Sequence, residues 1–144
     1  MNKEQIFELM NNNLVFYLAT VEDGEPRVRG MMLYKADKTG IVFHTGTFKD
    51  VYRQILNNPH VQLCFVDSVK NIQVRVRGTL EVVDDNVLKE EISNHPTRGF
   101  LQTWKESSTL EDFYNNFIVF RMKNGLANVW AFETNTAPKD DISL

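Results

Sequence analysis

Hydrophobic and polar residues change their spacing along the chain, and these changes divide it into elements. Ile6, Leu9 and Met10 recur at helical spacing, which predicts a short amphipathic helix over residues 3–12. Runs rich in β-branched and aromatic residues then predict strands at 14–21, 27–34, 41–45, 61–67 and 72–83. Stretches such as EDGEP, ADKTG and DSVKN between them have turn-forming composition. We therefore expect a series of strands that are mostly joined as hairpins.

Helical patterns interrupt the strands at three places. In TFKDVYRQILNNP, Thr47 is the candidate N-cap of a helix that Pro59 ends. The segments 85–96 and 109–116 predict two further helices, while the intervening TRGFLQTWKES has no recognisable period. The chain closes with FIVFRM, KNG and LANVWAFE, a pattern that predicts a last hairpin.

Many strands with few crossovers predict a mostly β fold, a β-barrel with peripheral helices. An antiparallel barrel is favoured because closure removes the exposed edges of a sheet. A length of 144 residues suits one domain, so we expect residues 1–144 to form a single unit. Hydrophobic residues make up 42% of the chain and charged residues 24%, which is typical of folded globular proteins.

The overall charge limits the classes of partner. A formal net charge of -3 and a pI near 5.6 argue against a general nucleic-acid or anionic-membrane binder, since both carry negative charge. Cys64 is the only cysteine, so no disulfide forms within the chain and a reducing compartment is favoured. No apolar stretch is long enough to span a bilayer, and MNKEQIFELM lacks a secretory apolar region, so we expect a cytoplasmic protein.

One short stretch gathers positive charge and hydroxyl groups. Arg27 and Arg29 share one face of a predicted strand, and two adjacent cations repel unless an anion joins them. HTGTFKD then leads into a helix, whose first N–H groups are unpaired and carry the positive end of the dipole. Thr45, Thr47 and Lys49 add donors at this point, so the stretch predicts a phosphate-binding cradle.

A plainer interpretation of the same stretch stays open. Arg27 and Arg29 would form a solvated face that pairs with the nearby acidic residues, and Thr47 would only cap the helix.

A second polar group follows on a later strand. Gln73, Arg75 and Arg77 share one face of IQVRVRG, where a glutamine amide offers both a donor and an acceptor to a planar heterocycle. In NVWAF near the end, Trp130 is either a surface for a flat ring or a core residue.

Taken together, several segments resemble the pyridoxamine 5'-phosphate oxidase-like FMN-binding split barrels. They are FYLATVEDGEPRVRGM, FHTGTFKDVYRQILNNPHVQLCFVD, IQVRVRG followed by VVDD, and NGLANVWAFE, and they cover roughly residues 14–85 and 117–133. The resemblance implies a six- to seven-stranded antiparallel split barrel and a homodimer with FMN in a cleft between its subunits. The cofactor-binding residues that it implies are Arg27, Val28, Arg29 and Met31 along the flavin, Thr45, Thr47 and Lys49 at the phosphate, and Gln73, Arg75 and Trp130.

The chain is also similar to one branch of this family. It lacks the Arg- and His-bearing ending of the vitamin B6 oxidases, and NVWAFETNTAPK looks like the nitroimidazole-resistance and general stress proteins. The resemblance implies an FMN-dependent oxidoreductase that takes electrons from a nicotinamide donor and reduces a small planar acceptor, such as a nitroaromatic or a quinone. Arg29 or Arg75 would then stabilise the anionic reduced flavin.

Other functions remain open at this point, and no catalytic residue is identified. The chain could be a stress protein that binds flavin or haem without turnover, in which case His44 is the histidine nearest the predicted cleft. It could also be a deazaflavin-dependent reductase. His44, His60 and His95 are widely spaced and form no metal-binding motif, so we expect no metal site.

Overall fold

The strands close into a barrel in the computed structural model, which describes residues 1–144. Six antiparallel strands follow in the order β4-β1-β2-β3-β6-β5, and β4 pairs with β5 to complete the ring. Their bounds are β1 (Val15–Glu22), β2 (Glu25–Asp37), β3 (Gly40–Gly46), β4 (His60–Asp67), β5 (Ile72–Val82) and β6 (Phe117–Met122). The strands β7 (Leu126–Ala131) and β8 (Ile142–Ser143) extend the sheet from β5. The predicted antiparallel barrel is therefore confirmed.

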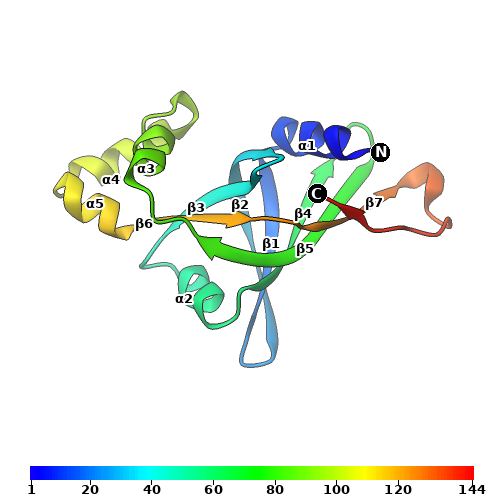
Figure 1. Cartoon of the computed structure of the whole chain (residues 1–144), viewed down its shortest axis with the longest axis horizontal. Coiled ribbons are helices and arrows are strands. Elements are labelled where there is room, and N and C mark those ends of the chain that lie inside the picture. Colours follow the sequence, from blue (N-terminus) through cyan, green and yellow to red (C-terminus); the bar gives the residue numbers. More distant parts are fainter.

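Helices lie around the barrel, as the sequence predicts. They are α1 (Lys3–Asn12), α2 (Asp50–Asn57), α3 (Asn86–Ser93), α4 (Gln102–Glu106) and α5 (Leu110–Asn116), with short 3-10 turns η1 (Pro96–Leu101) and η2 (Phe132–Thr134). Figure 1 shows α3, α4 and α5 grouped at one end of the long axis, away from α1. None of the helices combines the length and the apolar character that crossing a lipid bilayer requires.

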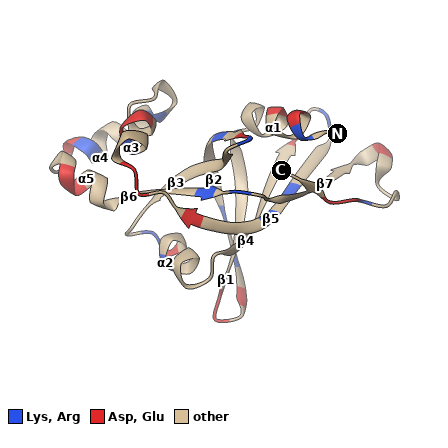
Figure 2. Ribbon diagram, viewed as in Figure 1, with Lys and Arg blue, Asp and Glu red and all other residues tan.

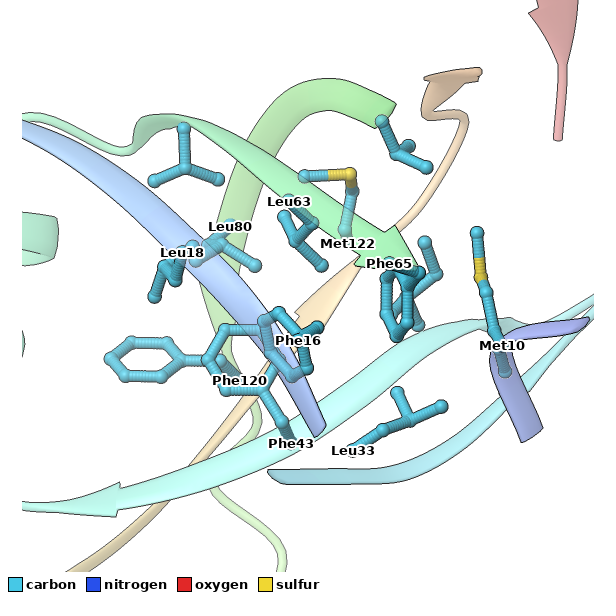
Figure 3. Close-up of a cluster of buried hydrophobic side chains, with 14 of the residues drawn as sticks. Met10, Phe16, Leu18, Leu33, Phe43, Leu63, Phe65, Leu80, Phe120 and Met122 are labelled. Atoms are coloured by element: carbon cyan, nitrogen blue, oxygen red, sulfur yellow. The ribbon is translucent and has the colours of Figure 1, made fainter. Parts of the chain in front are cut away.

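Alternating side chains fill the interior of the barrel. In β1, Phe16 and Leu18 are fully buried, and the buried Phe65 and Leu63 are their partners on the neighbouring strand β4. The Phe16 ring stacks on Phe65 at 4.9 Å between centroids and meets the edge of Phe43 at 5.2 Å (Figure 3). This cluster of 21 buried residues is called the barrel core below.

The strands β3 and β6 are buried on both faces, which explains their nearly continuous apolar sequences. One face contributes Phe43 and Phe120 to the barrel core. The other face packs against the helices α3 to α5 and η1 in a second cluster, called the helical core. Its buried members are Val42, Ile92, Leu101, Phe113, Phe117 and Val119.

The start of α2 differs from the expectation. Lys49, in extended conformation, is the N-cap, and no side chain caps the helix. Thr47 lies outside the helix and donates its hydroxyl to Asn116 Oδ1 at 2.6 Å, while its backbone N–H donates to the Asn116 carbonyl at 3.0 Å. The predicted Thr47 cap is wrong because this residue instead ties the β3–α2 connection to the end of α5.

The last two long strands do not form the predicted hairpin. Residues 80–82 of β5 pair with β6, and residues 72–77 of β5 pair with β7, so β6 and β7 follow one another along a single edge of β5. Asn124 has a φ of 54° in the connection, and at Gly125 a Cβ atom would lie 2.6 Å from Val76 Cγ1. The KNG segment therefore runs close along β5 and does not reverse the chain.

Candidate functional site

A cleft of about 900 Å³ lies where β2, β3 and the start of α2 meet the 3-10 turn η1 and α4. This volume is typical of small-molecule sites. The strands and α2 contribute Glu22, Arg27, Val28, Arg29, Gly30, Met31, Met32, His44, Thr45, Gly46, Phe48, Lys49, Asp50, Val51 and Gln54. Phe100, Leu101 and Trp104 come from η1 and α4 on the opposite side.

The structure gathers only part of the predicted site in this cleft. The predicted residues that line it are Arg27, Val28, Arg29, Met31, Thr45 and Lys49. Those that lie outside it are Thr47, Gln73, Arg75 and Trp130. The division follows the fold, since Thr47 is turned toward α5 while the other three lie on β5 and β7.

Arg29 is held by the protein itself. Its guanidinium donates to the Leu18 carbonyl at 3.2 Å, to Thr20 Oγ1 at 2.8 Å and to Gln54 Oε1. Thr20 and Gln54 are 1% and 3% exposed, and burial lowers the pKa of the arginine. Since all these partners are neutral, the positive charge of Arg29 is fixed in place beside the cleft without an ion pair.

Lys49 forms no salt bridge, whereas Arg27, which also lines the cleft, does. Arg27 pairs with Glu25 at 3.1 Å on the exposed β1–β2 hairpin, whose acidic tip is visible in Figure 2. The ammonium group of Lys49 is exposed and lies 5.9 Å from the centre of the Phe48 ring. It stands at the first turn of α2, where backbone N–H groups have no acceptor within the helix.

The two carboxylates that line the cleft both form ion pairs with one arginine. Arg53 on α2 binds Glu22 at 2.7 Å and Asp50 at 3.0 Å. Because one arginine partly neutralises both acids, the field at the start of α2 is dominated by Lys49 and the helix dipole. This end of the cleft therefore favours an anion.

Aromatic side chains form the walls on the helical side. The Phe48 ring meets the edge of Trp104 at 5.2 Å between centroids, and Phe100 is 59% exposed beside them. Gly46 sets the position of Phe48, because a Cβ at Gly46 would lie 2.7 Å from the Phe48 ring. Planar rings with exposed faces favour a flat ligand.

His44 lies at the inner end of the cleft, on β3. Its Nε2 accepts a hydrogen bond from Arg98 Nε at 2.9 Å, and its ring contacts Phe117 at 4.9 Å between centroids. Burial, with a smaller contribution from the charge of Arg98, lowers the pKa of His44 to about 4. At neutral pH the imidazole is therefore uncharged.

Gln73, Arg75 and Trp130 belong to an outer face of the barrel. Register pairs Gly30 with Tyr17, Tyr17 with Cys64, Cys64 with Arg75, and Arg75 with Asn128, whose Oδ1 accepts from Arg75 at 3.1 Å. Facing partners in antiparallel strands project to the same side. This row of side chains therefore leads from the cleft, which Gly30 lines, across to β7.

Sequence reasoning did not place the aromatic walls or the residues behind the cleft. Phe48, Phe100, Trp104, Gln54 and Arg98 are among them. The available signal was weak: TRGFLQTWKES combines large aromatic residues with an arginine in a segment of no clear period. No three His, Cys, Asp or Glu side chains gather in an arrangement able to hold a metal ion.

The sequence matches a known protein family. Residues 3–113 match the model of the family described as pyridoxamine 5'-phosphate oxidase. The chain is 36% identical over 97 residues to the pyridoxine/pyridoxamine 5'-phosphate oxidase of Brucella ovis, which covers 65% of this chain and 47% of that protein. The chain thus spans about half the length of the curated relatives it matches.

Solved structures share the fold. A NimC/NimA family protein from Clostridium acetobutylicum has a TM-score of 0.76 at 22% identity, covering 98% of this chain and 92% of that one. A pyridoxamine 5'-phosphate oxidase-related, FMN-binding protein from Nostoc punctiforme has a TM-score of 0.63 at 17% identity, covering 96% and 87%. The fold is thus the split barrel that the sequence predicts.

Proposed function

The chain belongs to the pyridoxamine 5'-phosphate oxidase family, and we propose that its cleft binds FMN. The matched residues 3–113 make up more than half of the chain, so the family expected from the sequence is confirmed. The proposal also takes residues 1–144 as a single FMN-binding split-barrel domain. It is supported by the FMN-binding protein from Nostoc punctiforme, which shares the fold.

One observation carries the proposal, namely the unpaired Lys49 at the first turn of α2 inside the cleft. In our assignment Lys49, Thr45 and the free N–H groups of α2 hold the phosphate. Thr47 is not part of this assignment, because its hydroxyl and its backbone N–H both donate to Asn116. The chemistry of this donor set suits a phosphate monoester.

The flavin ring would lie along β2, beside Arg27, Val28, Arg29 and Met31. Bound flavin supplies two-electron redox chemistry between a nicotinamide donor and a small planar acceptor, such as a nitroaromatic or a quinone. The residues of the chain position the ring and exclude water. Arg29 adds a fixed positive charge, which neutral partners leave uncompensated and which favours negative charge on a nearby ring.

We further propose a homodimer that forms through the outer face of the barrel. This face exposes large apolar side chains that water would not favour, among them Val15, Tyr17 and Val28, which are 63%, 52% and 70% exposed. Val28 and Gly30 also line the cleft, so a second copy seated on the face would close it. Gln73, Arg75 and Trp130 of the partner copy would then approach the flavin.

We also propose that the protein acts in the cytoplasm, where a reducing environment suits the lone Cys64. The proposal does not include the substrates of the longer curated relatives, because the chain spans only about half of their length.

The first test is the visible absorption spectrum of the protein purified without added cofactor and after reconstitution with FMN. We expect a flavin spectrum that bleaches when NADH or NADPH is added without oxygen. A protein that takes up no FMN at all would refute the proposal. Bound flavin that no nicotinamide reduces would retain the binding site and remove the proposed reductase activity.

A further inference from the structure

Arg98 is a fully buried cation that forms no ion pair. It lies in η1 and is 1% exposed, and none of the salt bridges of the chain includes it. Its partners are neutral: the Leu33 carbonyl at 2.5 Å, Thr97 Oγ1 at 2.9 Å, Met32 Sδ at 3.8 Å and the Tyr34 ring at 5.6 Å from its centroid. A buried charge without a counter-ion opposes folding, so this arrangement needs another explanation.

The remaining contact of Arg98 determines the protonation state of His44. An arginine Nε carries a hydrogen at all accessible pH values and can only donate. Its bond of 2.9 Å to His44 Nε2 therefore requires a free lone pair on that nitrogen. The single proton of the neutral ring must sit on Nδ1.

The Nδ1 atom of His44 opens to the cleft. The His44 ring forms one hydrogen bond, through Nε2, so Nδ1 has no partner within the chain. Every buried side-chain nitrogen or oxygen atom of the protein does have a partner. Nδ1 is therefore accessible, and His44 lines the cleft. The Phe117 and Phe100 rings, at 4.9 and 6.3 Å between centroids, keep the imidazole in its plane.

We infer that Arg98 is a positioning residue, which fixes His44 as a hydrogen-bond donor through Nδ1–H to an acceptor atom of the ligand in the cleft. The ligand then carries a carbonyl, nitro or unprotonated ring-nitrogen group at this end, beside the aromatic walls. The positive charge behind the ring polarises the N–H bond and disfavours a cationic ligand. The tautomer is a property of the chain, and only the ligand class rests on the proposed function.

Direct observation of the tautomer is the first part of the test. Heteronuclear NMR of isotope-labelled protein correlates the ring nitrogens of His44 with the ring carbon-bound hydrogens, and His44→Gln assigns the signals. We expect a single tautomer with the proton on Nδ1 from about pH 5 to pH 8. A proton on Nε2, or an averaged mixture, in the unmodified protein overturns the inference whatever any variant does.

The variant Arg98→Lys keeps the charge but removes the Nε donor. We expect it to release His44 into a mixture of tautomers, whereas a role in packing alone would leave the ring nitrogens unchanged. Circular dichroism checks that the variant folds. If it does not, the measurement on the unmodified protein decides.

Ligand titration tests the donor and separates this inference from the proposed function. FMN and 4-nitrobenzoate are added in turn while the Nδ1–H signal and the flavin absorbance are followed. We expect at least one probe to shift the Nδ1–H signal, and His44→Phe to weaken the binding of that probe about tenfold, roughly the value of one hydrogen bond. Failure of FMN to bind, with a shift caused by 4-nitrobenzoate, removes the flavin proposal and keeps the donor. A signal that neither probe moves overturns the donor.

Discussion

The barrel core and the helical core are both apolar, but they differ in what surrounds them. The barrel core lies mostly between strands, with α1 and α2 also contributing to it, and its members include Phe16 and Phe65 with no exposed surface. Val51 is the one buried member that lines the cleft. The helical core borders the cleft, because its Leu101 lines the cleft and its Phe117 contacts His44. We therefore expect the helical core to contribute more to ligand recognition than the barrel core does.

The largest expected effect is a loss of stability when one phenylalanine of each core is truncated to alanine. Phe16→Ala should lower the free energy of unfolding by about 4 kcal/mol, because a cavity opens where strands cannot collapse. Phe113→Ala should cost about 3 kcal/mol, since α5 lies at the end of the molecule and is freer to relax. Urea denaturation measures both values.

FMN binding by the same two variants tests this expected difference between the cores. Only Phe113→Ala should weaken binding, because Trp104 rests on Phe113 at 4.8 Å between ring centroids. Weakened binding by folded Phe16→Ala alone would contradict the expected difference.

The next expected effect is a pH dependence of the free energy of unfolding that arises from His44. Because its pKa is lowered to about 4 in the folded protein, the unfolded chain takes up a proton at higher pH than the folded one does. Stability should therefore fall as the pH decreases from about 6.5 to about 4, by about 3 kcal/mol from this group. Urea denaturation across this range measures the loss.

The variant His44→Gln is the control for this pH dependence. It should show a flatter profile over the same interval. Identical profiles in the two proteins would assign the loss to other groups.

A smaller effect concerns the anion-binding end of the cleft. Lys49→Ala should weaken FMN binding by about 2 kcal/mol, the value of a charge-assisted hydrogen bond, and leave both cores intact. Titration calorimetry gives the affinity. Lys38→Ala, on an exposed turn away from the cleft, is the matched control and should bind FMN as the unmodified protein does.

The smallest effect is expected on the surface. Arg121 Nε lies 2.7 Å from Glu81 Oε1 across β6 and β5, in an exposed pair. Arg121→Ala should lower stability by less than about 1 kcal/mol, and added salt should shrink the difference. A loss of stability as large as that of Phe113→Ala would mean that a surface ion pair contributes as much to stability as a core phenylalanine.

Local sequence pattern predicts most of the fold. Each of β1, β4 and α1 buries one face, and the spacing of apolar residues along the sequence indicates that face directly. The Thr47 cap and the β6–β7 hairpin failed because distant partners decide both: Asn116 takes the Thr47 side chain, and β5 offers one edge to both strands.

The cleft was only half predictable for a similar reason. Arg27 to Met31 and Thr45 to Lys49 are contiguous in sequence, so their chemistry is apparent in short segments. The aromatic walls and Arg98 reach the cleft through tertiary packing of η1 and α4, which have no clear period. Whether an arginine is buried against a histidine 54 positions away is not encoded in local spacing.

The close contact between Gly46 and Phe48 has a consequence for protein engineering. Any side chain at Gly46 must displace the Phe48 ring, since the first added carbon would already lie 2.7 Å from it. Phe48 is 65% exposed and free to move, so Gly46→Ala would alter the entrance of the cleft while the barrel core keeps its packing. A library restricted to this one position would therefore be an economical way to change which molecules the protein admits.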